Sequence, residues 1–125
     1  MCSGAYPGRV VEIPVDALFA QLREMVVLLA SPAGEQVSWL AKQHYPVDEL
    51  ALQLDDAVPA WFSRLREHQL LPEGAATALV DLNAYLGTIR SGSGLNPWSH
   101  EGLRVAPEWS RVRALATDAL GRLSG

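Results

Sequence analysis

The chain has 125 residues and a formal net charge of −4 at pH 7. Apolar residues make up 49% of it and charged residues 19%, which is typical of one globular domain and excludes a disordered segment. The acidic balance disfavours a dedicated nucleic-acid-binding protein, because such proteins neutralise phosphates with a basic surface. It is compatible with a basic protein partner.

The cysteine content and the apolar runs indicate where the protein acts. Cys2 is the single cysteine, so an internal disulfide is impossible and a reducing compartment is favoured. The longest clean apolar run, residues 25–30, is far shorter than the roughly 20 residues of a membrane span. Residues 1–9 lack the basic and apolar regions of a signal peptide. We therefore expect a cytoplasmic protein that does not enter a membrane.

The N-terminal residues differ in pattern from the rest of the chain. Residues 10–13 have β-forming side chains, and Pro14 ends this stretch. We predict an extended N-terminal arm over residues 1–14 and a single helical domain over residues 15–125. The arm either straps across the helices or pairs with a second chain as an edge strand, so both a monomer and a homodimer stay open.

Helical periodicity begins just after the arm. Asp16 is a good N-cap for a first helix, and Ser31 is predicted to cap a second helix that reaches about His44. A third helix begins near Asp48. Its apolar phase continues through Pro59, which favours a kink or two nearly collinear helices.

Three more helical segments follow. Pro72 opens a fourth helix whose apolar residues alternate in steps of four and three, which predicts a position at the centre of a bundle, and residues 91–94 end it. Ser99 caps a short helical turn that reaches Val105, and Pro107 starts the last helix. The predicted fold class is all-α, a compact bundle of five or six short amphipathic helices.

The residues that carry most enzyme chemistry do not form a recognisable pattern. The histidines are not spaced as metal ligands, and Cys2 is remote from them, so we predict no metal and no cofactor. His44 and His68 lie near predicted helix C-termini, where a structural role is favoured. Ser99, His100 and Glu101 are consecutive, so their side chains point apart and cannot form a relay. We predict no catalytic residue and no enzyme activity.

Paired carboxylates give the first candidate for partner binding. Asp48 and Asp55 are seven residues apart, as are Glu49 and Asp56, so each pair lies along one face of the third helix. This spacing indicates either an acidic ridge offered to a basic protein or an ordinary solvated helix face.

Aromatic residues give the second candidate. Trp39, Trp61 and Trp109 lie on or beside apolar stripes, which favours core packing, whereas Trp98 lies in a loop. Trp98 either anchors that loop on the bundle or is exposed for recognition. We add Trp98 and His100 to the four carboxylates as the predicted partner-binding surface.

An alternative function uses aromatic side chains differently. A pocket between helices, lined by Trp61, Phe62, Tyr85 and Trp98, would make the protein a small-molecule binder or an enzyme.

The C-terminal third has a distinctive order of residues. Asn96-Pro97-Trp98-Ser99-His100-Glu101-Gly102-Leu103 is followed by Pro107-Glu108-Trp109 and by an apolar helix that reaches Leu120. This segment resembles the end of small all-helical bacterial immunity-type proteins encoded beside polymorphic toxins. The resemblance implies a cytoplasmic inhibitor that binds a cognate toxin domain, and it assigns no particular binding residue.

Overall fold

The computed structural model describes residues 14–89 and 96–124, which form six α-helices. They are α1 (Val15–Ala30), α2 (Ala33–Gln43), α3 (Glu49–Glu67), α4 (Glu73–Leu86), α5 (His100–Val105) and α6 (Pro107–Ser124). These ranges contain no β-strand, so the predicted all-α bundle is confirmed. The predictions for residues 1–13 and for the helix stop at 91–94 lie outside the described ranges.

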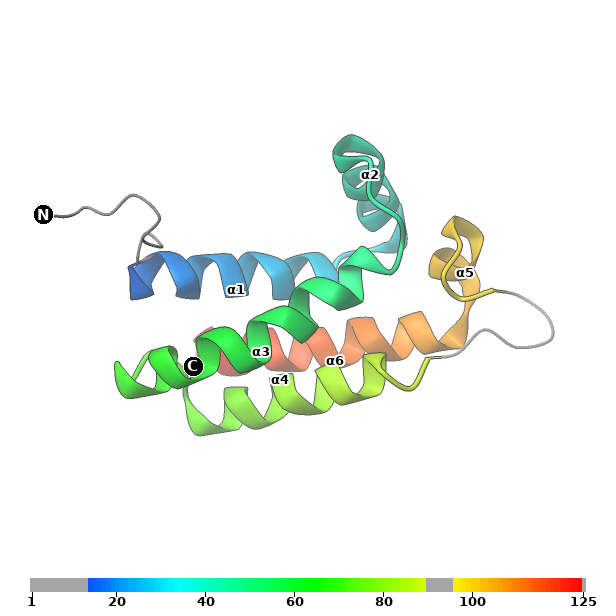
Figure 1. The fold of residues 1–125 in the computed structure, drawn as a ribbon. Coiled ribbons are helices and arrows are strands. Elements are labelled where there is room, and N and C mark those ends of the chain that lie inside the picture. The colour runs from blue at the N-terminus through cyan, green and yellow to red at the C-terminus, as the bar shows by residue number, and fades with distance from the viewer. Residues whose placement is uncertain (1–13, 90–95, 125) are drawn as a thin grey trace, which may run out of the picture.

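Four long helices form the body of the bundle, and two short ones lie at one of its ends. Going round the body, α1 packs against α3, α3 against α4, α4 against α6, and α6 against α1. The chain alternates in direction between α1, α3, α4 and α6 (Figure 1). Both α2, which joins α1 to α3, and α5, which joins α4 to α6, therefore lie at the same end. We call this the short-helix end.

The apolar stripes of the long helices meet inside this ring. Each contributes side chains that are almost completely buried, among them Leu22 of α1, Leu54 of α3, Leu79 of α4 and Trp109 of α6. These positions follow the helical period that the sequence shows. Removal of this apolar surface from water is the main favourable contribution to folding.

Two sequence predictions about α3 and α4 have different outcomes. α3 runs as one helix through Pro59, which lies on its exposed side, as the unbroken apolar phase indicated. The prediction that α4 lies at the centre is wrong, because α4 holds one of the four positions of the ring and contacts α3 and α6. Its regular apolar seam faces the shared interior of the ring rather than neighbours on all sides.

The predicted caps of the first two helices are corrected by the structure. α1 begins one residue before Asp16, with Pro14 at the N-cap, and Asp16 lies in the first turn, where its charge still favours the positive helix end. Pro32, not Ser31, occupies the N-cap of α2. The Ser31 hydroxyl instead donates to the Val27 carbonyl at 2.7 Å, so it satisfies the end of the preceding helix.

Candidate functional site

An open groove lies between α3 and α4 at the short-helix end. Its volume is ≈ 370 Å³. It is lined by residues from the first half of α3, from the end of α4 and from the segment before α5, namely Asp48, Ala51, Leu52, Asp55, Asn83, Leu86, Gly87, Ile89 and Trp98. Three residues predicted separately from the sequence, Asp48, Asp55 and Trp98, thus meet at one place.

The groove exists because α2 and α5 lean away from it. α2 contacts α1 and α5, and α5 contacts α2 and α6. Neither short helix therefore packs over the seam between α3 and α4. The walls of the groove are left open to solvent at this end.

The apolar part of the groove centres on Leu52. Its side chain is 48% exposed, although it belongs to a helix whose opposite face is buried in the core. Half-buried Ala51 and Trp98 and the buried Leu86 and Ile89 continue this surface. The groove therefore combines an exposed apolar surface with a half-buried tryptophan, the residue type that is enriched at binding hot spots.

The polar part of the groove consists of two carboxylates and one amide. Asp48 is exposed at the N-cap of α3, and its side chain forms no capping hydrogen bond. Asp55, also exposed, accepts a hydrogen bond from Asn83 Nδ2 at 3.3 Å across the seam. No basic side chain is among the described residues that line the groove.

The other three predicted binding residues lie outside the groove lining. Glu49 is half-buried at the first position of α3, Asp56 is exposed one residue beyond Asp55, and His100 is exposed at the start of α5. The spacing of seven residues correctly predicts that Asp48 and Asp55 share a face. The second pair is rotated by about 100° around the helix from the first pair, so it lies outside the groove lining.

Trp98 anchors its loop and also lines the groove. Its ring is half-buried and meets the Trp109 ring edge to face, with centroids 5.5 Å apart and an interplanar angle of 89°. The indole N–H of Trp109 donates to the Pro97 carbonyl at 2.7 Å. Trp98 is therefore held in a fixed orientation, and this corresponds to the anchoring alternative.

The segment around Trp98 is a tightly built corner. Ser99 Oγ accepts from the Gly102 N–H at 2.9 Å, so the predicted cap of α5 is confirmed. A Cβ on Gly102 would lie 2.1 Å from the Asn96 carbonyl oxygen, so only glycine fits there. We call residues 96–109 the α5 corner. The contacts of Asn96, Ser99, Gly102 and Trp109 hold this corner in shape.

On the side of the short-helix end formed by α1 and α6, a polar network joins the short helices to the body of the bundle. Gln36 of α2 is fully buried, and its Nε2 donates to the carbonyls of Leu28 and Leu29, both at 3.1 Å. Its Oε1 accepts from Nε and Nη2 of Arg113 at 3.2 and 3.1 Å. Arg113 also donates to the Leu103 carbonyl. The Gln36–Arg113 network therefore joins α1, α2, α5 and α6.

Sequence reasoning missed this network. On α2 the buried residues are Gln36 and Leu40, whereas Val37 is half-buried and Ala41 is exposed. The available signal is spacing, because Gln36 stands four residues before the buried Leu40 and so shares its face. Its partner Arg113 is 77 residues away along the chain.

Burial affects the pKa of the Arg113 guanidinium. Desolvation lowers the pKa of its guanidinium below the usual value for arginine. The residue nevertheless stays protonated at neutral pH, because the unperturbed pKa of arginine is so high. Its partners in the network are neutral oxygens, so the network holds α6 against α2 and α5 by charge-assisted hydrogen bonds.

The aromatic pocket considered as an alternative is not formed. Trp98 lines the groove, whereas Phe62 lines a separate shallow hollow nearer the far end of α3. That hollow also contains Arg66 and Glu73, which are paired at 3.0 Å. The predicted set of four aromatic residues is therefore wrong as a single site.

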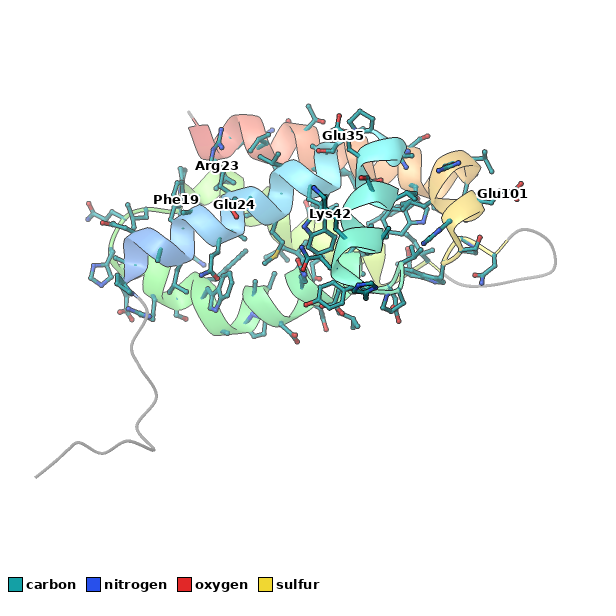
Figure 2. The ribbon with its side chains drawn as sticks, turned by 90° about the horizontal axis from the view of Figure 1, so that it is seen from above. Phe19, Arg23, Glu24, Glu35, Lys42 and Glu101 are labelled. Carbon is teal, nitrogen blue, oxygen red and sulfur yellow. The ribbon has the colours of Figure 1, made fainter. Side chains whose placement is uncertain are left out.

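The face formed by α1 and α2 differs from the groove in its charge. Figure 2 shows Arg23 and Glu24 on α1 and Glu35 and Lys42 on α2, and all four side chains are exposed. Both signs of charge are interspersed there, as is usual for a solvated surface. The groove, by contrast, carries one sign only.

Residues 14–89 and 96–124 contain no group of three or more histidine, cysteine, aspartate or glutamate side chains placed to hold a metal ion. None of the helices in these ranges has the length and apolar character needed to cross a membrane.

Comparison of the chain with protein-family models, with curated proteins and with solved structures found no match in any of the three.

Proposed function

We propose that this protein is a non-catalytic binding module that recognises another protein through the groove between α3 and α4. The observation that carries the proposal is the convergence of Asp48, Asp55 and Trp98 around the exposed Leu52. A rigid apolar centre with polar groups at its edge is the usual composition of a protein-binding hot spot.

Rigidity of the site supports the same function. Trp98 is fixed by Trp109, and the α5 corner that carries both rings is held by Ser99 and Gly102. A preformed anchor loses little conformational entropy when a partner binds, so more of the contact energy appears as affinity.

The finer proposal concerns the class of partner. The resemblance of the C-terminal third to immunity-type proteins suggests a cytoplasmic inhibitor that binds a bacterial toxin domain. Such an inhibitor needs surface contacts and no catalytic group, which agrees with the chemistry of the groove. The acidic groove would then face a basic part of the toxin.

The test begins with the genes that flank the coding sequence. Their products are co-expressed with this protein, and complexes are isolated and weighed by native mass spectrometry. We expect one stable complex, and we expect Leu52→Gln to weaken it at least tenfold by removing the apolar anchor. If that partner is a toxin, the wild-type protein restores growth and the variant does not.

Val80→Gln is the matched control for that variant. Val80 is 47% exposed, against 48% for Leu52, but it lies on α4 outside the groove. Equal effects of the two substitutions would contradict the groove as the binding site. Failure of every flanking product to bind would contradict the immunity proposal.

A small-molecule function is the second candidate. The groove volume of ≈ 370 Å³ is within the range of ligand pockets. Two carboxylates beside an apolar wall favour a small organic cation. A thermal-shift screen of aliphatic diamines and aromatic amines tests this function, and a rise in melting temperature that Asp55→Asn removes would support it.

A further inference from the structure

We infer that the groove takes an amphipathic helix that carries two basic residues seven positions apart, with apolar residues between them. This inference rests on the proposed protein-binding function and specifies the chemistry of the bound segment. It follows from the order of the groove residues along α3.

The first step is the spacing of charge along α3. Asp48 and Asp55 are separated by seven residues, with Leu52 between them on the same wall. Seven residues of helix rise by about 10.5 Å. Consider a partner helix that lies along α3. Two of its side chains have the same separation as Asp48 and Asp55 when they too are seven residues apart. Its residues at the third and fourth positions between them then meet Leu52.

The second step is that both charged side chains that line the groove, Asp48 and Asp55, are hydrogen-bond acceptors. The Asn83 Nδ2 group already donates to Asp55 at 3.3 Å, and its side-chain oxygen remains an acceptor. A partner that pairs with these acceptors must therefore bring donors.

The third step is the availability of Asp48. Its side chain is exposed and makes no hydrogen bond or ion pair with another residue in the described ranges. It is the more accessible of the two carboxylates, since Asp55 is already bonded to Asn83. A guanidinium or ammonium group can approach it without breaking an existing contact.

The charge complement excludes an acidic or neutral segment as the preferred occupant. Pairing of opposite charges at the two ends of the groove fixes the position of the bound helix along α3, whereas the apolar centre of the groove supplies affinity. An extended strand fits less well, because side chains on one face of a strand repeat every second residue, at about 6.6 Å or 13 Å. A helix matches the spacing of about 10.5 Å directly.

The test uses synthetic helical peptides as probes, so it does not depend on finding the natural partner. One peptide has arginines at positions i and i+7 and leucines at i+3 and i+4 in an alanine–glutamine background. A register control has the same composition with arginines at i and i+5. Binding of each labelled peptide to the full chain is measured by fluorescence anisotropy at several salt concentrations.

We expect the i, i+7 peptide to bind at least tenfold more tightly than the register control. The double variant Asp48→Asn, Asp55→Asn should weaken its binding about tenfold, as two exposed ion pairs imply, and should reduce the salt dependence. The matched double variant Glu49→Gln, Asp56→Asn removes the same charge from the same helix outside the groove. It should change affinity less than twofold. Circular dichroism verifies that both variants fold.

Three results would overturn the inference. They are equal binding of the two peptides, equal effects of the two double variants, and no binding at millimolar peptide. If a natural partner nevertheless binds and Leu52→Gln weakens that complex, the proposed function stands without the inference. If the i, i+7 peptide binds more tightly than the register control but no product of a flanking gene binds, the inference about the bound helix stands and the immunity proposal does not.

Discussion

The two sides of the short-helix end are built in opposite ways. On the α1–α6 side, α2 and α5 pack down, and Gln36 and Arg113 saturate the polar groups beneath them. On the α3–α4 side no short helix covers the seam, and Leu52 and Asp48 face solvent. One side of this end therefore holds the short helices against the body, while the other leaves apolar and acidic side chains exposed to solvent.

We expect substitutions in the α5 corner and the Gln36–Arg113 network to destabilise the protein and a substitution on the open side to leave its stability unchanged. Three substitutions test this division by chemical denaturation, and a fourth tests the end of α2.

Gly102→Ala should have the largest effect, about 3 kcal/mol or more. The added Cβ would lie 2.1 Å from the Asn96 carbonyl oxygen and 2.7 Å from Pro97 Cα, which are backbone atoms that cannot move aside cheaply. Gly121→Ala is the control, because nothing lies within 4 Å of its Cβ position. It should stabilise α6 by about 0.5 kcal/mol. Equal effects would show that the α5 corner is loose.

Gln36→Leu should cost about 2–3 kcal/mol. The substitution leaves the Leu28 and Leu29 carbonyls and the Arg113 guanidinium without their buried partner. The double variant with Arg113→Met should lose less than the sum of the two single losses, because the partners are removed together. Additive losses would contradict the Gln36–Arg113 network as a unit.

His44→Gly should stabilise the protein by about 0.5–1 kcal/mol. His44 ends α2 with φ 60°, in the left-handed region that glycine adopts without strain. Gln69→Gly gives the comparison at the opposite end, after α3, where φ is 59°. Both caps use the same backbone conformation, so we expect similar gains, and a gain at Gln69 alone would indicate that the His44 ring contributes contacts of its own.

Leu52→Gln should have the smallest effect on folding, within about 0.5 kcal/mol, because its side chain is 48% exposed. The same substitution is expected to weaken partner binding, so Leu52→Gln should lower the affinity for the partner without changing the free energy of unfolding. A loss above 1 kcal/mol would mean that the open side also supports the core.

The helices and their main breaks were predictable because they follow local rules. Periodicity located each segment, Ser99 was identified as a cap, and Pro107 as a helix start. The N-caps predicted at Asp16 and Ser31 are displaced by two residues and by one residue, because Pro14 and Pro32 occupy these positions.

The candidate site was predictable only in parts. The heptad spacing of Asp48 and Asp55 on one helix is local information. That Trp98 lies beside them depends on how α4 and α5 pack, which a single sequence does not specify. Gln36 and Arg113 are 77 residues apart, and neither residue type signals burial, so their pairing required the fold.

The close approach at Gly102 also provides a criterion for recognising true relatives of this protein. A descendant that keeps the α5 corner must keep glycine there, together with a small capping hydroxyl three residues earlier. Positions 48, 52 and 55 are under no such steric constraint. If the groove binds a partner whose sequence changes during evolution, we expect these positions to vary among relatives while the α5 corner stays constant. The ratio of change at these two sets of positions would reveal whether the groove has been the target of selection.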